Sequence, residues 1–301
     1  MKTVSVVTVN YNQPKATVEL LESIREKNTY PRLDVIVVDN GSIIDPVPQW
    51  QQDFPAYTFI RSDTNMGFAG GNNLGLRYCK SDYAFLINND TVITDRLVDD
   101  LVQFLESNPD YAMVSPKIRY YDEPNMLQYA GFTKMNFFTA RNKCVGQFET
   151  DNGQYDDHNG LTHYAHGAAM MIRKDLIDRV GLMPEIYFLY YEEMDWCEMF
   201  KRAGYKIGLY MKALIYHKES LATGKNSKLK DYYMNRNRLL FVRRNGNMYQ
   251  LLVFSLYYIV VLQTRYIVSC IRQGLTDRLL IFPKALAWNL THGSKSATTI
   301  S

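Results

Sequence analysis

Short apolar runs alternate with amphipathic helical patterns over the first two hundred residues. Runs of strand length cover residues 3–9, 33–38, 58–60, 83–87 and 168–172. Between them, residues 16–27 place Val18, Leu21 and Ile24 on one helical stripe, and residues 174–180 form another helical segment. Strands that alternate with helices predict a mainly parallel sheet with right-handed crossovers. Ligands of such sheets bind beyond the carboxyl ends of the strands, where this chain places polar residues.

The pattern changes after residue 120. Residues 120–163 are rich in aromatic and polar side chains without a clear period, which predicts a variable insertion or loop region. A helix is expected after Glu192, and residues 204–210 and 213–217 predict two closing strands.

The last part of the chain predicts a different kind of element. Residues 248–271 are apolar and aromatic, but their uncharged part, 248–264, is slightly shorter than the ~18 residues of a spanning helix. Four arginines flank or interrupt this stretch: Arg243, Arg244, Arg265 and Arg272. Such a basic amphipathic helix is typical of a membrane interface. The alternatives are a helical hairpin that packs on the main domain or on another subunit, and a true span.

Charge divides the chain in the same way. The 301 residues carry a net charge of +3, but residues 201–301 have 17 Lys/Arg against 3 Asp/Glu. This asymmetry indicates an anionic partner. The basic residues surround an apolar helix and no base-stacking platform, which disfavours nucleic acid. The apolar fraction of 47% excludes a disordered chain. Four isolated cysteines and a start unlike a signal peptide predict a cytoplasmic catalytic part.

Two common phosphate-binding motifs are missing from the sequence. The first strand is followed by Asn10-Tyr11-Asn12 where a dinucleotide-binding sheet has G-x-G-x-x-G, and the chain has no P-loop motif. Hydride transfer and P-loop phosphoryl transfer are thereby disfavoured. The glycine-rich segment 65–73 precedes a predicted helix and fits either a turn or the close approach of backbone to a ligand.

Acidic residues follow three of the predicted elements. Asp39 ends one strand and could accept hydrogen bonds from a base or ribose, although Asp-Asn-Gly-Ser is also an ordinary turn. Asp90 ends another strand and suits Mg²⁺ or Mn²⁺ with diphosphate oxygens, or caps the next helix. Glu192, Glu193 and Asp195 repel one another, so a desolvated site would raise at least one pKa toward that of a general base. Their alternative role is to favour a helix N-terminus.

Eight segments taken in order resemble family 2 glycosyltransferases of the GT-A fold, and most closely the rhamnosyltransferase-like bacterial branch. The segments are residues 7–12, 37–42, 65–73, 86–91, 167–173, 188–196, His217 and 233–237. The resemblance implies a GT-A glycosyltransferase domain over residues 1–245, a Rossmann-like mixed, mainly parallel α/β sheet flanked by helices. Residues 246–301 would be a C-terminal, membrane-associating amphipathic helical extension.

The resemblance also implies roles for individual residues. Asp39 would contact the base or ribose of a nucleoside diphosphate sugar, and Asp90 with His217 would hold a divalent cation, Mg²⁺ or Mn²⁺. Glu193 stands at the position of the catalytic base, with Glu192 and Asp195 beside it. The remaining donor contacts would come from Val9, Asn10, Asn12, Gly67, Gly71, Asn72, Asn73, Asn88, Asn89 and Arg236.

Two departures from the family pattern matter. The metal motif reads Asn88-Asn89-Asp90, so it has one carboxylate and leans on the substrate diphosphate for metal affinity. The base is a glutamate in place of an aspartate, which leaves Glu192 or Asp195 as alternatives for that role.

The expected function is inverting transfer of rhamnose or another hexose from a dTDP- or UDP-sugar to a glycan or lipid-linked acceptor in cell-surface polysaccharide synthesis. The enzyme would sit peripherally on the cytoplasmic face of the inner membrane, and a homo-oligomer is an open alternative. A catalytically inactive carbohydrate- or nucleotide-binding protein of this fold and a sugar nucleotidyltransferase are the competing functions.

Overall fold

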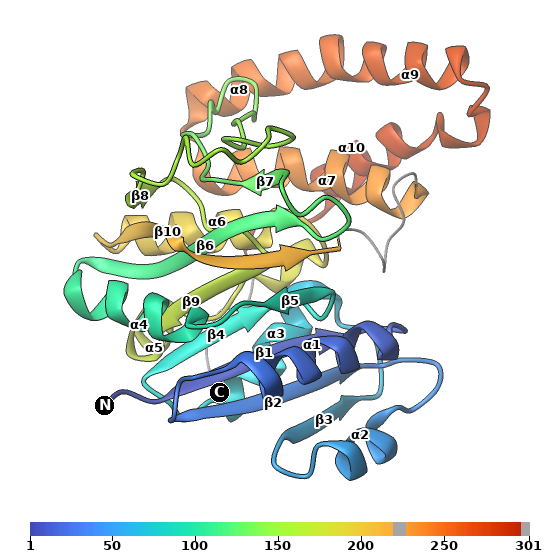
Figure 1. The fold of residues 1–301 in the computed structure, drawn as a ribbon. Coiled ribbons are helices and arrows are strands. Elements are labelled where there is room, and N and C mark those ends of the chain that lie inside the picture. Colours follow the sequence, from blue (N-terminus) through green and yellow to red (C-terminus); the bar gives the residue numbers. More distant parts are fainter. Residues whose placement is uncertain (219–226, 296–301) are drawn as a thin grey trace.

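The computed structural model describes residues 1–218 and 227–295. Within these residues the strands form one mixed sheet with the order β3-β2-β1-β4-β9-β6-β10-β5 (Figure 1). Strands β1, β2, β3, β4, β6 and β10 run in one direction, while β9 and β5 run against them. The strands are β1 (Val4–Asn10), β2 (Leu33–Asn40), β3 (Thr58–Ser62), β4 (Tyr83–Ile87), β5 (Thr91–Ile93), β6 (Tyr111–Tyr120), β7 (Leu127–Tyr129), β8 (Gly160–Thr162), β9 (Ala169–Arg173) and β10 (Lys206–His217). The predicted mixed, mainly parallel sheet is confirmed.

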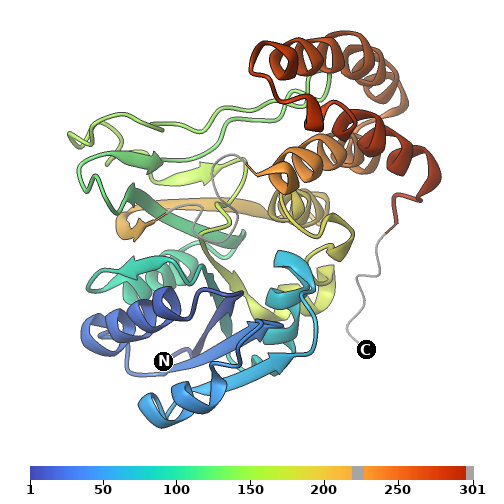
Figure 2. The same ribbon diagram turned by 90° about the vertical axis from the view of Figure 1, so that its right-hand side faces the viewer.

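Helices cover both faces of this sheet. Alternate residues of each central strand point to opposite faces, so Val6 and Val37 join one apolar core while Val7 and Ile36 join the other. The first core includes α1 (Pro14–Lys27), α2 (Val47–Asp53) and α4 (Leu97–Ser107); the second includes α3 (Gly67–Tyr78), α5 (Lys174–Val180), η1 (Glu185–Tyr187), α6 (Glu192–Arg202) and α7 (Lys228–Asn245). Figure 2 shows this layering edge-on. The two-sided burial explains why the strands read as continuous apolar runs.

Three details differ from the sequence prediction. The two closing strands are one strand, β10, because a bulge between Tyr210 and Leu214 interrupts the register with β6 without ending the pairing. Asp90 precedes the short strand β5, so it does not cap a helix. The glycine-rich segment does not precede helix α3 but forms its first turns.

Residues 120–163 are mostly irregular, as the sequence predicts. They cross the sheet edge through β7 and β8 and through isolated bridges such as Phe132 to Cys144. Lys117 and Arg119 of β6 both form ion pairs with the buried carboxylate of Asp151, which fastens the segment to the sheet. The insertion is therefore a fixed wall above the carboxyl edge of the strands.

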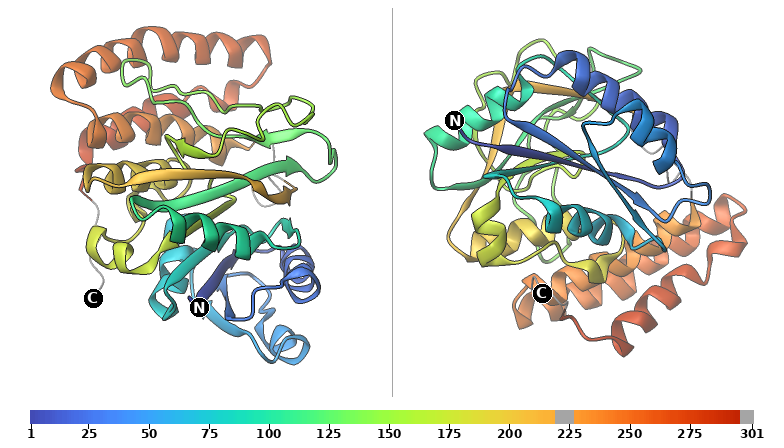
Figure 3. Two further views of the ribbon diagram at one scale, coloured as in Figure 1. Left: turned by 60° about the vertical axis from the view of Figure 1, so that its left-hand side comes forward. Right: turned by 90° about the horizontal axis from the view of Figure 1, so that it is seen from below.

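The C-terminal segment is helical and packs through α7. It comprises α8 (Met248–Tyr257), η2 (Tyr258–Leu262), α9 (Gln263–Arg272), η3 (Thr276–Arg278) and α10 (Ile281–Thr291). A small apolar core joins Phe254, Tyr258 and Phe282 to Leu239 and Val242 of α7, and Figure 3 shows α8 and α9 projecting beyond the sheet layers. Residues 248–272 are long and apolar enough to cross a membrane, and 17% of their most apolar window is buried. Most of this helix is therefore exposed in the monomer.

Candidate active site

A cleft of about 410 Å³ opens at the carboxyl edge of the sheet. Its floor is built from the ends of β1, β2, β4 and β10, one wall from residues 188–193, and the other from the insertion. Of the residues predicted for the site, eight line this cleft: Val9, Gly67, Asn88, Asn89, Asp90, Glu192, Glu193 and His217. Segments more than a hundred residues apart thus meet where open α/β sheets bind ligands.

Asp90 and His217 face each other on the cleft floor. His217 Nε2 lies 3.1 Å from Asp90 Oδ1, and His217 Nδ1 lies 2.8 Å from Gln128 Oε1. When the Nδ1 proton is donated to Gln128, Nε2 presents a lone pair to the carboxylate oxygen. Two hydrogen-bond acceptors, the Asp90 oxygen and the His217 nitrogen, then lie 3.1 Å apart in residues that are almost completely buried. A positive charge between them would stabilise this pair.

The Asp90–His217 pair fits a divalent cation. Adjacent ligands of an octahedral ion at ~2.1 Å lie about 3 Å apart, close to the observed separation. Among the described residues no group of three or more His, Cys, Asp or Glu side chains is placed to hold a metal. The remaining ligands would therefore have to be substrate oxygens and water.

Glu192 and Glu193 begin helix α6 and belong to the cleft wall formed by residues 188–193. Burial raises the pKa of Glu193 to about 7, opposed by hydrogen bonds from the backbone amides of Glu193 and Met194. Burial and the neighbouring charge of Glu193 raise the pKa of Glu192 well above its usual range. The Glu192 side chain is 2% exposed, and its Oε2 atom has no hydrogen-bond partner among the described residues. A carboxylate with a pKa near neutrality can accept a proton from a bound hydroxyl.

The segment that leads into α6 has an unusual backbone. Phe188, Tyr190 and Tyr191 have φ angles of 63°, 69° and 76°. For bulky residues this region is strained and costs on the order of 1–3 kcal/mol each. Phe188 O accepts a hydrogen bond from Phe68 N at 2.7 Å, which ties the strained segment to the start of α3. Strain of this kind persists only where surrounding contacts determine the conformation.

Gly67 makes this close contact possible, and its substitution should be costly. A Cβ atom at Gly67 would lie 2.2 Å from Phe188 O, and its φ is +74°. Gly204 is a matched control because its φ is +92° but nothing lies within 4 Å of an added Cβ. We expect Gly204→Ala to lose about 1 kcal/mol of unfolding free energy from the backbone alone. Gly67→Ala should lose at least about 2 kcal/mol more in urea unfolding, because the clash is with backbone; equal losses would contradict the tight fit.

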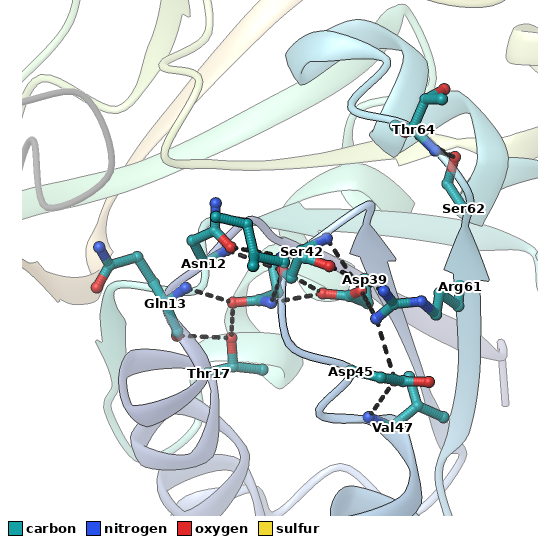
Figure 4. A network of polar contacts seen from close by, with 12 residues as sticks. Asn12, Gln13, Thr17, Asp39, Ser42, Asp45, Val47, Arg61, Ser62 and Thr64 are labelled. Carbon is teal, nitrogen blue, oxygen red and sulfur yellow. Dashed lines mark hydrogen bonds and ion pairs between the residues drawn. The ribbon is translucent and has the colours of Figure 1, made fainter.

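Asp39 lies beneath the cleft and not in its lining. Its carboxylate accepts from Asn10 Nδ2 at 2.7 Å, from Ser42 Oγ at 2.5 Å and from Arg61 Nη1 at 2.7 Å (Figure 4). Asn12 also belongs to this network, through its backbone amide to Ser42 and its side chain to Ile43 N. A ligand contact from Asp39 would require exchange of one of these partners.

The predicted donor contacts on α3 serve packing instead. A Cβ atom at Gly71 would lie 2.7 Å from Val9 Cγ1, so this glycine lets the helix approach β1. Asn72 Nδ2 donates to Phe68 O, and Asn73 Nδ2 donates to Met183 O and Glu185 Oε1. Unlike Gly67, these three residues are not among those that line the cleft, which the glycine-rich pattern alone does not reveal.

Asp195 and Arg236 also lie outside the cleft lining. Asp195 is fully buried and accepts from Arg244 Nε at 2.5 Å and from Asn245 Nδ2 at 2.6 Å, which joins α6 to α7. Arg236 is 5% exposed, and its Nη2 donates to the backbone carbonyls of Ile186 and Tyr187. The diphosphate contact expected of Arg236 therefore has no support from its position.

Several cleft residues were not predicted from the sequence. Lys230 of α7 is the one Lys or Arg side chain among the described residues that line the cleft. His166 lines it as well, and its Nδ1 accepts from Ala168 N at 3.1 Å, which leaves Nε2 as the protonated nitrogen. Phe68 and Phe188 add apolar surface. Phe68 and Phe188 fall within the segments 65–73 and 188–196 singled out in the sequence, but no motif marks Lys230 or His166, which only the fold brings to the cleft.

The chain resembles known proteins in sequence and in fold. The profile of "Glycosyl transferase family 2" matches residues 5–181, more than half of the chain. "Low-salt glycan biosynthesis hexosyltransferase Agl10" from Haloferax volcanii is 28% identical over 215 residues, which are 68% of this chain and 63% of that protein. The chain thus spans less than two thirds of that relative's length.

Solved structures share the fold. A mannosyltransferase from Pyrobaculum calidifontis in complex with GDP-Man and Mn²⁺ superposes with a TM-score of 0.60 at 18% identity, covering 98% of this chain and 76% of that one. S. aureus TarS residues 1–349 in complex with UDP gives 0.56 at 15% identity, covering 96% and 82%. These neighbours confirm the GT-A fold expected from the motifs. The profile match, which covers more than half of the chain, shows that the chain belongs to glycosyl transferase family 2.

Proposed function

We propose that this protein transfers a hexosyl group from a nucleoside diphosphate sugar to a hydroxyl of a glycan or lipid-linked acceptor, with inversion at the anomeric carbon. One observation carries the proposal: Glu193, at the start of α6, and the Asp90–His217 pair, on the cleft floor, line the same cleft. The family relative from Haloferax volcanii is a hexosyltransferase of glycan biosynthesis, which supports the acceptor class. A dTDP- or UDP-linked donor and a role in cell-surface polysaccharide synthesis remain part of the proposal.

In this proposal the protein residues perform the steps of a direct displacement. Glu193 takes the proton of the acceptor hydroxyl while its oxygen forms a bond to the anomeric carbon. The bond from that carbon to the diphosphate oxygen breaks, and the nucleoside diphosphate leaves with the electron pair. Lys230 lies in the cleft where it can pair with the departing diphosphate. Asp90 and His217 would hold a divalent cation, which supplies charge stabilisation to the diphosphate when bound.

Product analysis tests the proposal and separates it from its competitors. Purified protein would be incubated with UDP-, dTDP- and GDP-linked sugars, Mn²⁺ and a lipid-linked acceptor. We expect release of a nucleoside diphosphate together with a glycosylated acceptor. In a parallel reaction with added pyrophosphate, release of a nucleoside triphosphate together with sugar 1-phosphate would indicate a sugar nucleotidyltransferase. No product from any donor that binds would indicate a binding protein and overturn the proposal.

We also propose that the C-terminal helix lies on an anionic membrane surface, where lipid-linked acceptors reside. Leu252, Leu256 and Val260 are 61%, 59% and 64% exposed and follow one another at four-residue spacing. Phe254, Tyr258 and Leu262 occupy the buried side of the same helix. Arg265 and Arg272 line one groove of α9 and supply charge for phosphate headgroups.

Liposome flotation checks this orientation. The variant Leu252→Glu/Leu256→Glu should lose most of its binding to anionic vesicles, since it removes apolar insertion and adds negative charge. Gln51→Glu/Gln52→Glu adds the same charge at exposed positions of α2, far from the C-terminal helices, and is the matched control. We expect the control to retain most of its binding at low salt. Equal flotation of both variants would contradict the orientation, and failure of the unmodified protein to float would contradict the membrane proposal.

A further inference from the structure

Two side chains of α7 hold the backbone that leads into Glu192 and Glu193. Asn237 Nδ2 donates to three carbonyl oxygens, those of Tyr187 at 3.0 Å, Leu189 at 2.7 Å and Tyr190 at 2.8 Å. Arg236 Nη2 donates to Ile186 O at 2.9 Å and to Tyr187 O at 2.5 Å. Both side chains are buried. Adjacent residues of one helix thus engage four carbonyls of a five-residue stretch.

These bonds fall on the strained part of the chain. Phe188, Tyr190 and Tyr191 are the positive-φ residues immediately before α6, and a carbonyl on either side of Phe188 is bound by Asn237. Arg236 Nε also donates to Asn237 Oδ1 at 2.7 Å, which fixes the amide so that its nitrogen faces the carbonyls. The side-chain donors of Arg236 and Asn237 therefore stabilise the strained backbone, and the carbonyls of that backbone in turn satisfy these donors.

Aromatic rings also pack against Phe188 and against the Arg236 guanidinium. The Phe188 ring stacks on Tyr233 with centroids 5.1 Å apart. The Arg236 guanidinium lies 4.6 Å from the Tyr233 ring centroid and 4.3 Å from that of Trp288 in α10. A guanidinium held between two rings and bonded to carbonyls has little freedom to turn toward a ligand.

We propose that Arg236 and Asn237 are positioning residues, which fix residues 186–191 in the conformation that presents Glu192 and Glu193 to the cleft. The inference rests on the proposed function, because it assigns these residues to placement of the base. It also gives Arg236 a role different from the diphosphate contact expected from the sequence. Small displacements of a reacting group lower the rate steeply while leaving ground-state binding intact.

Asn237→Ala tests the proposal. We expect kcat to fall roughly 10- to 100-fold, the range for a misplaced group, while the dissociation constant for the free nucleoside diphosphate changes less than about twofold. The rate is expressed per nucleotide-binding site titrated by calorimetry, so misfolded protein does not count. The apparent pKa in the pH dependence of kcat/KM should also shift, because Glu193 changes its surroundings. Asn235→Ala on the same helix is the control, since Asn235 donates only to Asp231 O within α7; it should retain kcat and pH profile.

Arg236→Lys separates positioning from diphosphate binding. Lysine keeps the charge but cannot reproduce the planar donor set, so we expect a reduced kcat with unchanged nucleotide affinity. Weakened nucleotide binding with an unchanged kcat would make Arg236 a diphosphate ligand and overturn the proposal. A kcat for Asn237→Ala equal to that of Asn235→Ala would overturn it too. If the unmodified protein transfers no sugar, the proposed function itself is overturned. That result differs from the two variant results above, which overturn only the positioning role.

Discussion

Glu193→Gln should lose sugar transfer by roughly 10²- to 10⁴-fold, the usual contribution of a positioned general base. Glutamine has nearly the same shape but accepts no proton from the acceptor hydroxyl. Donor binding should be retained, so calorimetry with the nucleoside diphosphate is measured beside the rate. Glu198→Gln on the same helix is the control: Glu198 contacts Tyr164 and Lys201 outside the cleft lining. Near-normal transfer by Glu193→Gln would remove Glu193 from the role of base.

The neighbouring glutamate should respond differently. Burial and the charge of Glu193 raise the pKa of Glu192 well above its usual range, which favours the neutral carboxyl group that glutamine imitates. We therefore expect Glu192→Gln to be much milder than Glu193→Gln. If Glu192→Gln proved the more damaging substitution, the two assignments would have to be exchanged.

The pH dependence follows from the same carboxyl. With a pKa of about 7 in the folded protein, Glu193 becomes a competent base as the pH rises through 7, and kcat/KM should rise with it. The free energy of unfolding should instead fall as the pH rises. The folded state binds this proton more tightly than the unfolded state, so unfolding free energy falls as the pH rises from about 4.5 through 7. Glu193→Gln should flatten this part of both profiles.

Asp90→Asn should weaken cation-dependent nucleotide binding by at least about 10- to 100-fold, the loss known for groups that only support a metal ligand. The substitution removes the one carboxylate of the Asn88-Asn89-Asp90 segment, whose Oδ1 lies 3.1 Å from His217 Nε2. Calorimetry with the nucleoside diphosphate is done with Mn²⁺ and with a chelator. The nucleoside diphosphate affinities of Asp90→Asn and the unmodified protein should differ with Mn²⁺ and should be equal with the chelator.

Asp95→Asn is the matched control for this experiment. It makes the same change of one atom and one charge at an exposed position five residues further on. Its nucleotide affinity should equal that of the unmodified protein in both conditions. Equal affinity of Asp90→Asn and Asp95→Asn with Mn²⁺ would count against a metal role for Asp90.

The sequence predicts the frame of the site better than its walls. Asp90 and His217 could be expected together because strand ends of a mainly parallel sheet share an edge. Glu193, which begins helix α6, was expected beside them from the family resemblance, and all three line the cleft. The direction of a helical side chain depends on what the helix packs against, which periodicity does not fix. Asn73 therefore turned out to hold Met183 and Glu185, and Lys230 was found in the cleft only from the structure.

The same reasoning explains the error over the two closing strands. Residues 211–213 lie in a bulge where the pairing of β10 with β6 shifts register. A bulge weakens the alternation of side chains that a strand prediction uses, although the backbone continues in the sheet.

Contacts between α10 and α7 bear on how this protein can be made easier to handle. Asn289 Nδ2 donates to Arg236 O at 2.9 Å, and Trp288 covers the Arg236 guanidinium. Trimming the chain before α8 to improve solubility would remove both contacts from the turn of α7 whose side chains bind the backbone before Glu192 and Glu193. Poor turnover by such a shortened protein could result from the loss of these contacts, so it would not be evidence for membrane attachment. Recoding the exposed apolar side chains of α8 to polar ones, with α10 left intact, is the safer route to a soluble and active enzyme.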